Sequence, residues 1–194
     1  IPHVSCYSLS IEEGTLLDKM VKKGLMPYPD ETLDRAMYDL SIKSLQKANI
    51  NQYEISNFAK PGYECRHNIG YWKRDEYLGF GISAHSLFNE TRYSNTDDIH
   101  QYIATLNKYE KPVVDSNVLT QEEILSEYII LRFRLNSGLD IIDFKKEFDL
   151  DFEKTYKDKL TNLITIGLLD KSSNAYYLTR LGMDFANKVF VEFM

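Results

Sequence analysis

The sequence is poor in cysteine and in long apolar runs, and these shortages exclude several classes of protein. Cys6 and Cys65 are its only cysteines, too few for the disulfide framework of a small secreted domain. No apolar run approaches the roughly 18 residues that a membrane-spanning helix needs. A basic segment followed by an apolar stretch, the pattern of a signal peptide, is also missing at the N-terminus. We therefore expect a cytoplasmic, reduced protein without a transmembrane segment.

An excess of basic residues is missing as well. The formal net charge is −6, and residues 118–194 hold 10 Lys and Arg against 13 Asp and Glu. Affinity for nucleic acid depends on neutralising phosphates, and no helix predicted in this part carries a basic stripe. We therefore expect no nucleic-acid partner, although the order of elements predicted for this part is typical of a winged helix.

The N-terminal part alternates strand and helix patterns. Strands are predicted at Val4–Ser10 and Gln52–Ser56, and helices at Thr15–Lys23 and from Asp30 to Asn49. A strand, about 20 residues of helix and a second strand are the rhythm of a βαβ unit. A long irregular stretch is predicted next, over residues 57–75.

An apolar segment that contains glycine follows the irregular stretch. Tyr77–Phe88 is predicted as a strand broken by Gly79 and Gly81, which allow close approach of another backbone or a ligand. A helix is predicted at Asp97–Tyr109. The character of the sequence changes near Lys111–Pro112, so we place a domain boundary between residues 110 and 111.

Residues 111–194 have a mainly helical pattern. Thr120 and Glu123 have the spacing of a capping box, in which each side chain bonds the backbone of the other residue. This capping box begins the first helix of the part. Two further helices, a small hairpin and a last helix are predicted at Ile141–Phe148, Phe152–Ile164, Leu168–Leu178 and from Thr179 onward. Such an order indicates a winged-helix-like α+β module.

The densest gathering of polar and aromatic side chains is Gly62–Trp72. It contains Cys65, His67, two tyrosines and the only tryptophan of the chain. A neutral imidazole can ligate iron, and flat aromatic rings suit the face of a porphyrin. Taken alone, a histidine in such a stretch is more often a hydrogen-bonding residue. Cys65 alone cannot make a structural metal site, because such sites need about four ligands.

Four blocks of the chain resemble one known family. They are Tyr7–Thr15, Gln52–Gly62, His67-Asn68-x-x-Tyr71-Trp72 and Tyr77–Ser86, and they follow the order and spacing of the oxygen-independent coproporphyrinogen III oxidase superfamily of radical-SAM proteins. The resemblance covers nearly the whole chain, more loosely after about residue 115. Within this superfamily the chain resembles the HemW branch, because the HemN branch has an Arg-Asn-Phe-Gln-Gly-Tyr type of stretch in place of the His-Asn-x-x-Tyr-Trp block.

The resemblance to the HemW branch implies a heme-binding and heme-trafficking function. It implies heme binding by His67, Asn68, Tyr71 and Trp72, with His67 as the ligand of the iron. It also implies delivery of heme to a membrane-bound acceptor protein. Such a function is compatible with a cytoplasmic protein that associates with the membrane peripherally. The alternative is an oxidoreductase of porphyrin biosynthesis that acts as a coproporphyrinogen III oxidase.

The same resemblance implies two further cofactors for a longer protein. Ser10 and His85 lie at strand ends where the family contacts S-adenosylmethionine, and barrel sites gather at such ends. The family holds a four-iron four-sulfur cluster on a Cys-x-x-x-Cys-x-x-Cys loop, and Cys6 and Cys65 cannot form that loop. We therefore expect the cluster-binding part to precede this chain, and we expect no catalysis from the chain alone.

The fold that the resemblance implies is α/β. Residues 1–110 are expected to form the C-terminal βα units of a partial, TIM-like radical-SAM barrel, and residues 111–194 a winged-helix-like HemN C-terminal domain. An incomplete barrel exposes a strand edge and apolar faces. We therefore expect homo-oligomers, or else coverage of that edge by helices of the same chain.

Overall fold

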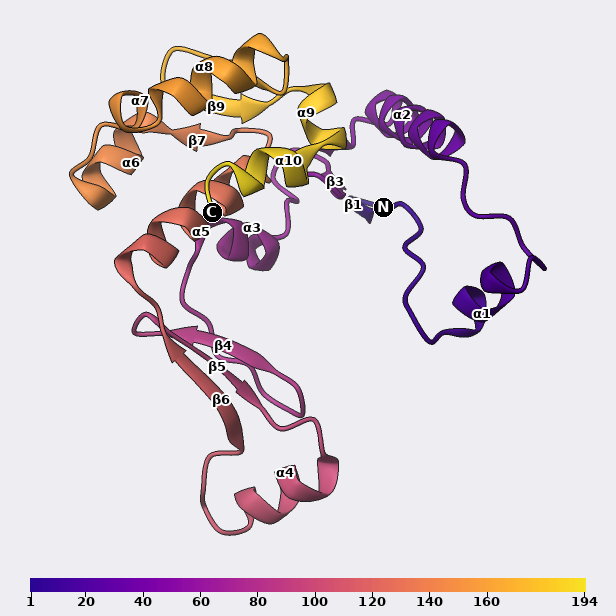
Figure 1. Cartoon of the computed structure of the whole chain (residues 1–194), viewed down its shortest axis with the longest axis vertical. Helices are drawn as coiled ribbons and strands as arrows, with labels where there is room; N and C mark the ends of the chain where they lie inside the picture. The colour runs from indigo at the N-terminus through magenta and orange to yellow at the C-terminus, as the bar shows by residue number, and fades with distance from the viewer. The chain divides into compact units, whose positions relative to one another are not determined.

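The computed structural model describes all 194 residues, and the chain divides into two compact units. Residues 1–65 form the first unit and residues 66–194 the second (Figure 1).

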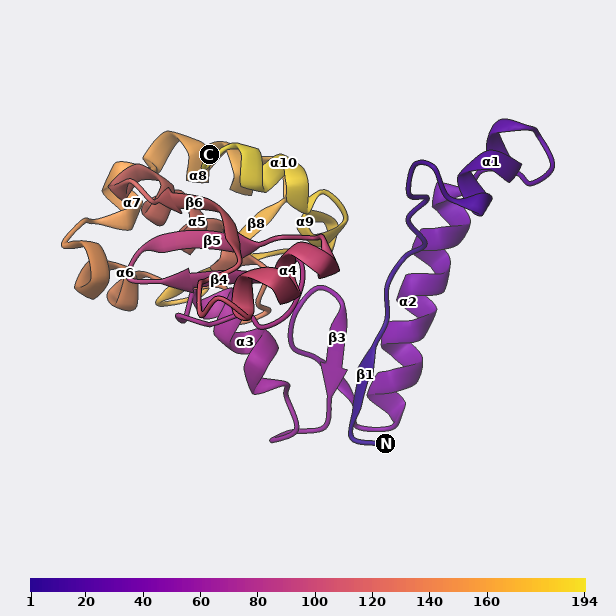
Figure 2. The same ribbon diagram turned by 90° about the horizontal axis from the view of Figure 1, so that it is seen from below.

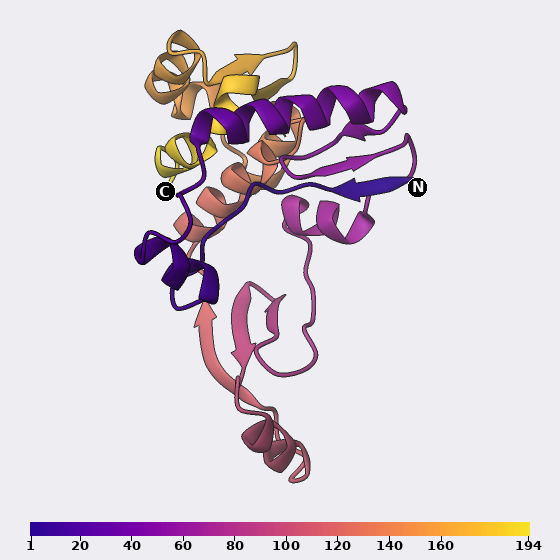
Figure 3. The ribbon, with the colours of Figure 1, turned by 90° about the vertical axis from the view of Figure 1, so that its right-hand side faces the viewer.

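Residues 1–65 form a small antiparallel sheet with a long helix on one face. Their elements are β1 (His3–Ser5), α1 (Leu16–Lys22), α2 (Glu31–Lys47), β2 (Asn51–Gln52) and β3 (Asn57–Ala59). α2 lies along the sheet (Figures 2 and 3), and its Tyr38 packs with Ile50 and Phe58 in a buried apolar cluster. Removing these side chains from water is the main force that holds the helix against the strands.

Both helices of this unit begin where the sequence predicts. The side chain of Thr15 accepts a hydrogen bond from the Asp18 N–H at 3.2 Å, and that of Asp30 accepts one from the Leu33 N–H at 2.7 Å. These caps satisfy backbone donors that the first turn of a helix leaves without a partner. Gly24 follows α1 with a φ of +69°, a conformation that glycine adopts without strain. The predicted helices are therefore confirmed.

The predicted βαβ unit is wrong in its pairing. β1, α2 and β2 follow one another, but β3 lies between the two strands and pairs antiparallel with both. The strand expected at Gln52–Ser56 stops after Gln52 because the chain turns around the fully buried Glu54. One carboxylate oxygen of Glu54 accepts hydrogen bonds from the Ser56 N–H at 3.0 Å and from the Asn57 side chain. Likewise, β1 ends at Ser5 and not at Ser10.

The second unit begins with a helix and a second antiparallel sheet. Its first elements are α3 (Arg66–Lys73), β4 (His85–Phe88), β5 (Thr91–Asn95), α4 (Ile99–Leu106) and β6 (Val113–Val118). The strand order is β4-β5-β6, and α4 lies beyond one end of this sheet (Figure 1). The expectation that residues 57–75 are irregular is wrong, because they contain β3 and α3.

The segment predicted as one strand at Tyr77–Phe88 is a strand only at its end. Tyr77 makes an isolated antiparallel bridge with Leu87, and the chain between them loops out before β4 begins. The predicted α4 is confirmed, with the Asp98 side chain as its cap. The domain boundary expected between residues 110 and 111 stays a prediction. β6 lies after that boundary, but it pairs with β5, which lies before it.

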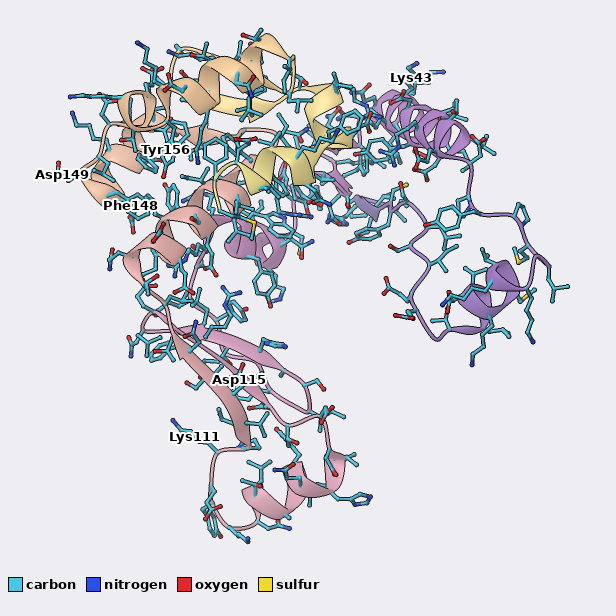
Figure 4. All side chains as sticks on the ribbon, in the orientation of Figure 1. Lys43, Lys111, Asp115, Phe148, Asp149 and Tyr156 are labelled. Carbon is cyan, nitrogen blue, oxygen red and sulfur yellow. The ribbon has the colours of Figure 1, made fainter.

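The remainder of the second unit has the predicted order of helices and hairpin. Its elements are α5 (Gln121–Phe133), β7 (Leu139–Asp140), α6 (Ile141–Phe148), α7 (Phe152–Thr155), α8 (Lys157–Thr165), β8 (Leu169–Lys171), β9 (Ala175–Leu178), α9 (Arg180–Asp184) and α10 (Ala186–Val191). β7, β9 and β8 form a three-stranded antiparallel sheet in that order. Phe148 and Asp149 mark the end of α6 (Figure 4), and the buried rings of Phe133, Phe144 and Phe152 fill the interior.

The capping box of α5 gives a prediction about pH. The Thr120 N–H donates to the Glu123 carboxylate at 2.7 Å, and this backbone bond lowers the pKa of Glu123 below 4.5. A lowered pKa stabilises the fold above pH 4.5, and the contribution is lost as the pH falls through the lowered value. Glu123→Ala should therefore shift the urea midpoint at neutral pH, and the shift should shrink in acid. Fluorescence of Trp72 reports the transition, and an equal shift at both pH values would contradict the prediction.

Candidate functional site

The predicted heme residues lie on α3, and they point to two sides of it. His67 and Tyr71 are four residues apart, as are Asn68 and Trp72, so each pair shares one side of the helix. Successive residues are about 100° apart around a helix axis, so the two pairs lie side by side and do not coincide. The structure therefore brings His67 together with Tyr71, and Asn68 together with Trp72.

A ladder of three rings runs along the first of these sides. The rings of His67 and Tyr71 meet edge to face with centroids 4.5 Å apart, and the rings of Tyr71 and Tyr77 do so at 4.6 Å. Such perpendicular contacts are a favoured geometry of aromatic pairs. Burial raises the pKa of Tyr77 above its ordinary value. We call His67, Tyr71 and Tyr77 the ring ladder.

The imidazole at the end of the ring ladder is available to a ligand. His67 is exposed to solvent, and neither ring nitrogen makes a hydrogen bond to the protein. A neutral imidazole nitrogen with a free lone pair is a common ligand of heme iron. The residues therefore fit a heme whose iron His67 would ligate.

The second side of α3 faces the protein. The Arg134 guanidinium lies over the Trp72 ring, 4.3 Å from its centroid, and α3 packs against α5. The indole N–H of Trp72 is buried without a hydrogen-bond partner. Asn68, on the same side, is half-buried. Trp72 therefore fixes the position of the helix in this structure and does not join the ring ladder.

An ion-pair network that the sequence did not reveal holds the C-terminal end of α3. The Arg74 guanidinium lies 2.5 Å from the Glu90 carboxylate and 3.1 Å from that of Glu127, which also binds Arg92 at 2.9 Å. The Arg74 side chain is only 9% exposed. Burial by itself would lower the pKa of Arg74, but the two carboxylates outweigh it and raise that pKa. These partners are 16 and 53 positions away in sequence, so no local motif announces them.

The two residues predicted to contact S-adenosylmethionine lie in different units. Ser10 is an exposed residue of the loop after β1, and His85 is exposed at the start of β4, opposite Ser94. Their assignment stays a prediction. The sequence also singled out Gly79 and Gly81 in the segment that contains His85. Gly79 does allow a close approach of another backbone segment, whereas Gly81 has open space around it.

The chain does not offer the ligands of an iron–sulfur cluster. Cys6 and Cys65 are free and half-buried, and no three His, Cys, Asp or Glu side chains gather as a metal site. A four-iron cluster needs several thiolates brought together, so these residues do not fit one. None of the helices is both long enough and apolar enough to cross a bilayer.

Comparison with known proteins first defines the class. The family described as the HemN C-terminal domain matches residues 119–185. The whole fold is similar to that of coproporphyrinogen III oxidase (HemN) from Escherichia coli, which is a radical SAM enzyme. The TM-score is 0.69 at 19% identity, over 91% of this chain and 44% of that one. The fold is therefore that of a HemN-type radical-SAM protein, as predicted.

The relatives then narrow the class to one branch. The chain is 33% identical to proteins named heme chaperone HemW from Lactococcus lactis, over all of this chain, and from Bacillus subtilis, over 99% of it. It spans about half the length of these relatives, 51% in each case, and corresponds to their C-terminal half. The chain is therefore similar over its whole length to the HemW-like branch of the HemN family, which confirms the resemblance found in the sequence.

Proposed function

We propose that this chain carries the heme-binding surface of a heme-trafficking protein and that His67 is the ligand of the iron. The observation that supports this most directly is the imidazole of His67, which is exposed, makes no hydrogen bond and is backed by the Tyr71 ring. The names of the relatives, heme chaperone HemW, favour heme as the cargo.

The geometry of the ring ladder suits reversible binding. The edge-to-face contact with Tyr71 limits rotation of the exposed His67 imidazole. One exposed nitrogen supplies a single bond to iron and leaves the other face of the porphyrin to a second ligand. A cargo held in this way can pass to an acceptor by ligand exchange. Asn68 and Trp72 stay predicted heme residues, and their place on the second side of α3 makes positioning of the helix the simpler role.

The remaining parts of the proposal concern the longer protein. S-adenosylmethionine would be bound with the help of Ser10 and His85, and residues outside this chain would supply the thiolates of a four-iron cluster. Heme would be delivered to a membrane-bound acceptor by a cytoplasmic protein that associates with the membrane peripherally. The chain would also self-associate through its open sheet edge.

A titration with hemin tests the proposed function. Increasing amounts of the chain should shift the Soret absorption band of hemin in a saturable way, because the imidazole of His67 ligates the iron. A spectrum that stays that of free hemin would refute heme binding by this chain. Consumption of coproporphyrinogen by the longer, cluster-loaded protein, without retention of heme, would favour the oxidase alternative instead.

A further inference from the structure

A second aromatic surface lies in residues 66–194, and it shares no residue with the ring ladder. It is a cleft of about 580 Å³ between the β4-β5-β6 sheet, the loop at 78–80 and the segment from α4 to β6. Five of its side chains carry aromatic rings: Phe80, Phe88, Tyr93, Tyr102 and Tyr109. We call it the aromatic cleft. Phe88 and Tyr93 stand on the same face of the sheet, because Tyr93 pairs with Ser86, two residues before Phe88.

Hydrogen bonds hold the loop wall of the aromatic cleft in place. The Gly81 N–H donates to the Tyr102 hydroxyl of α4 at 3.1 Å, and the Asn95 side chain of β5 donates to the Gly81 carbonyl at 2.9 Å. Gly79 lies so close to the backbone of His85 that a Cβ at this position would stand 2.2 Å from the His85 carbonyl oxygen. The wall that carries Phe80 is therefore formed before any ligand arrives, which lowers the entropy cost of binding.

Two rings at the mouth of the aromatic cleft have no role in the core. Phe80 is 86% exposed and Tyr109 is fully exposed. Exposed apolar side chains that gather around a concave surface mark binding sites more often than isolated ones do. The volume also lies within the range of sites for small molecules, which are mostly apolar with a few polar groups. Here the polar groups are tyrosine hydroxyls, Asn95, Glu110 and Lys111.

We propose that the aromatic cleft binds the flat ring of a tetrapyrrole by stacking, without a bond to the metal. Flat rings between aromatic side chains gain from both apolar burial and ring contacts. The lining contains no His, Cys or Met, and its tyrosines are the only side chains of a type that ligates heme iron, so the binding proposed here uses the faces of the rings. Lys111, on the segment that leads into β6 (Figure 4), offers a cation to an acidic side arm. The choice of tetrapyrrole rests on the proposed function, but the site is a different one.

A titration with metal-free protoporphyrin IX tests this proposal, because the probe has no iron for His67 to bind. The chain should change the fluorescence of the probe in a saturable way. Phe80→Ala and Tyr109→Ala should each weaken binding about tenfold, the effect expected for the loss of one stacked ring. Both side chains are exposed, so the fold should survive. Tyr28→Ala, at a tyrosine that is 70% exposed in residues 1–65, is the matched control.

The effect of His67→Ala separates the two sites. Unchanged protoporphyrin binding in His67→Ala, together with weaker binding in both cleft variants, would support the aromatic cleft, whatever the hemin titration shows. Equal binding by wild type, Phe80→Ala and Tyr109→Ala would overturn it, as would a loss of binding confined to His67→Ala. An absence of protoporphyrin binding would overturn the cleft while leaving a positive hemin titration intact.

Discussion

His67→Ala should remove the protein-bound Soret band that appears when hemin is added to the chain. The imidazole is the only exposed nitrogen ligand on the ring ladder, and the ring of Tyr71 packs against it. Without this imidazole the protein contacts only the porphyrin ring. Those contacts are apolar and do not depend on the metal. We expect the affinity of this site for hemin to fall at least about a hundredfold, the change that corresponds to roughly 2.7 kcal/mol.

Two further variants make this test specific. His100→Ala removes another exposed histidine of residues 66–194, on α4, and should leave the spectrum unchanged. Tyr71→Phe keeps the ring that backs the imidazole, so it should retain the band. A Soret band that is the same in wild type and His67→Ala would withdraw His67 as the iron ligand. Loss of the band in His100→Ala as well would point to a general effect on the fold.

Phe152→Ala should be the most destabilising substitution of a single residue in the second unit. Phe152 is 1% exposed, and its ring meets those of Phe144, Tyr156, Tyr176 and Phe193 at centroid distances between 4.9 and 6.4 Å. Truncation of such a ring removes apolar burial and leaves a cavity that the neighbours fill only in part. We expect a loss of about 3–5 kcal/mol in the free energy of unfolding.

Urea unfolding measures this loss. Trp72 is the only tryptophan and lies in the same unit, so its fluorescence follows the transition. Phe152→Leu, which keeps most of the volume, should fall between wild type and alanine and provides a measurement if the alanine variant does not fold. Phe185→Ala is the matched control, because Phe185 is 43% exposed and should cost about 1 kcal/mol or less. Equal losses at Phe152 and Phe185 would contradict the packing argument.

The helices were predictable because their signals are local. Thr15, Asp30, Thr120 and Thr179 each cap a helix through a hydrogen bond from the backbone N–H three residues later, and the sequence shows these spacings directly. The strands of the second sheet lack such signals. Residues 91–95 read Thr-Arg-Tyr-Ser-Asn, with no apolar alternation, and they form β5 because β4 and β6 pair with them from both sides.

The candidate site was predictable only as far as its motif. The block from His67 to Trp72 directed attention to the right residues, but the glycine at position 70 and the polar composition obscured the helix on which they lie. The side of α3 on which each residue stands follows from the helical period once the helix is known. The contact of Trp72 with Arg134 and the ion pairs of Arg74 depend on tertiary packing, and no spacing in the sequence encodes them.

The close approach at Gly79 restricts how this segment can vary. A methyl group at position 79 would meet the carbonyl oxygen of His85, so every alternative residue is excluded by the path of the main chain itself. An unchanging glycine here among related sequences would therefore report a steric requirement of the loop and would be no evidence of a reacting group. Position 81 differs, because open space surrounds it and only its φ of +105° disfavours a side chain. An L side chain would therefore meet an atomic clash at position 79, but only backbone strain at position 81.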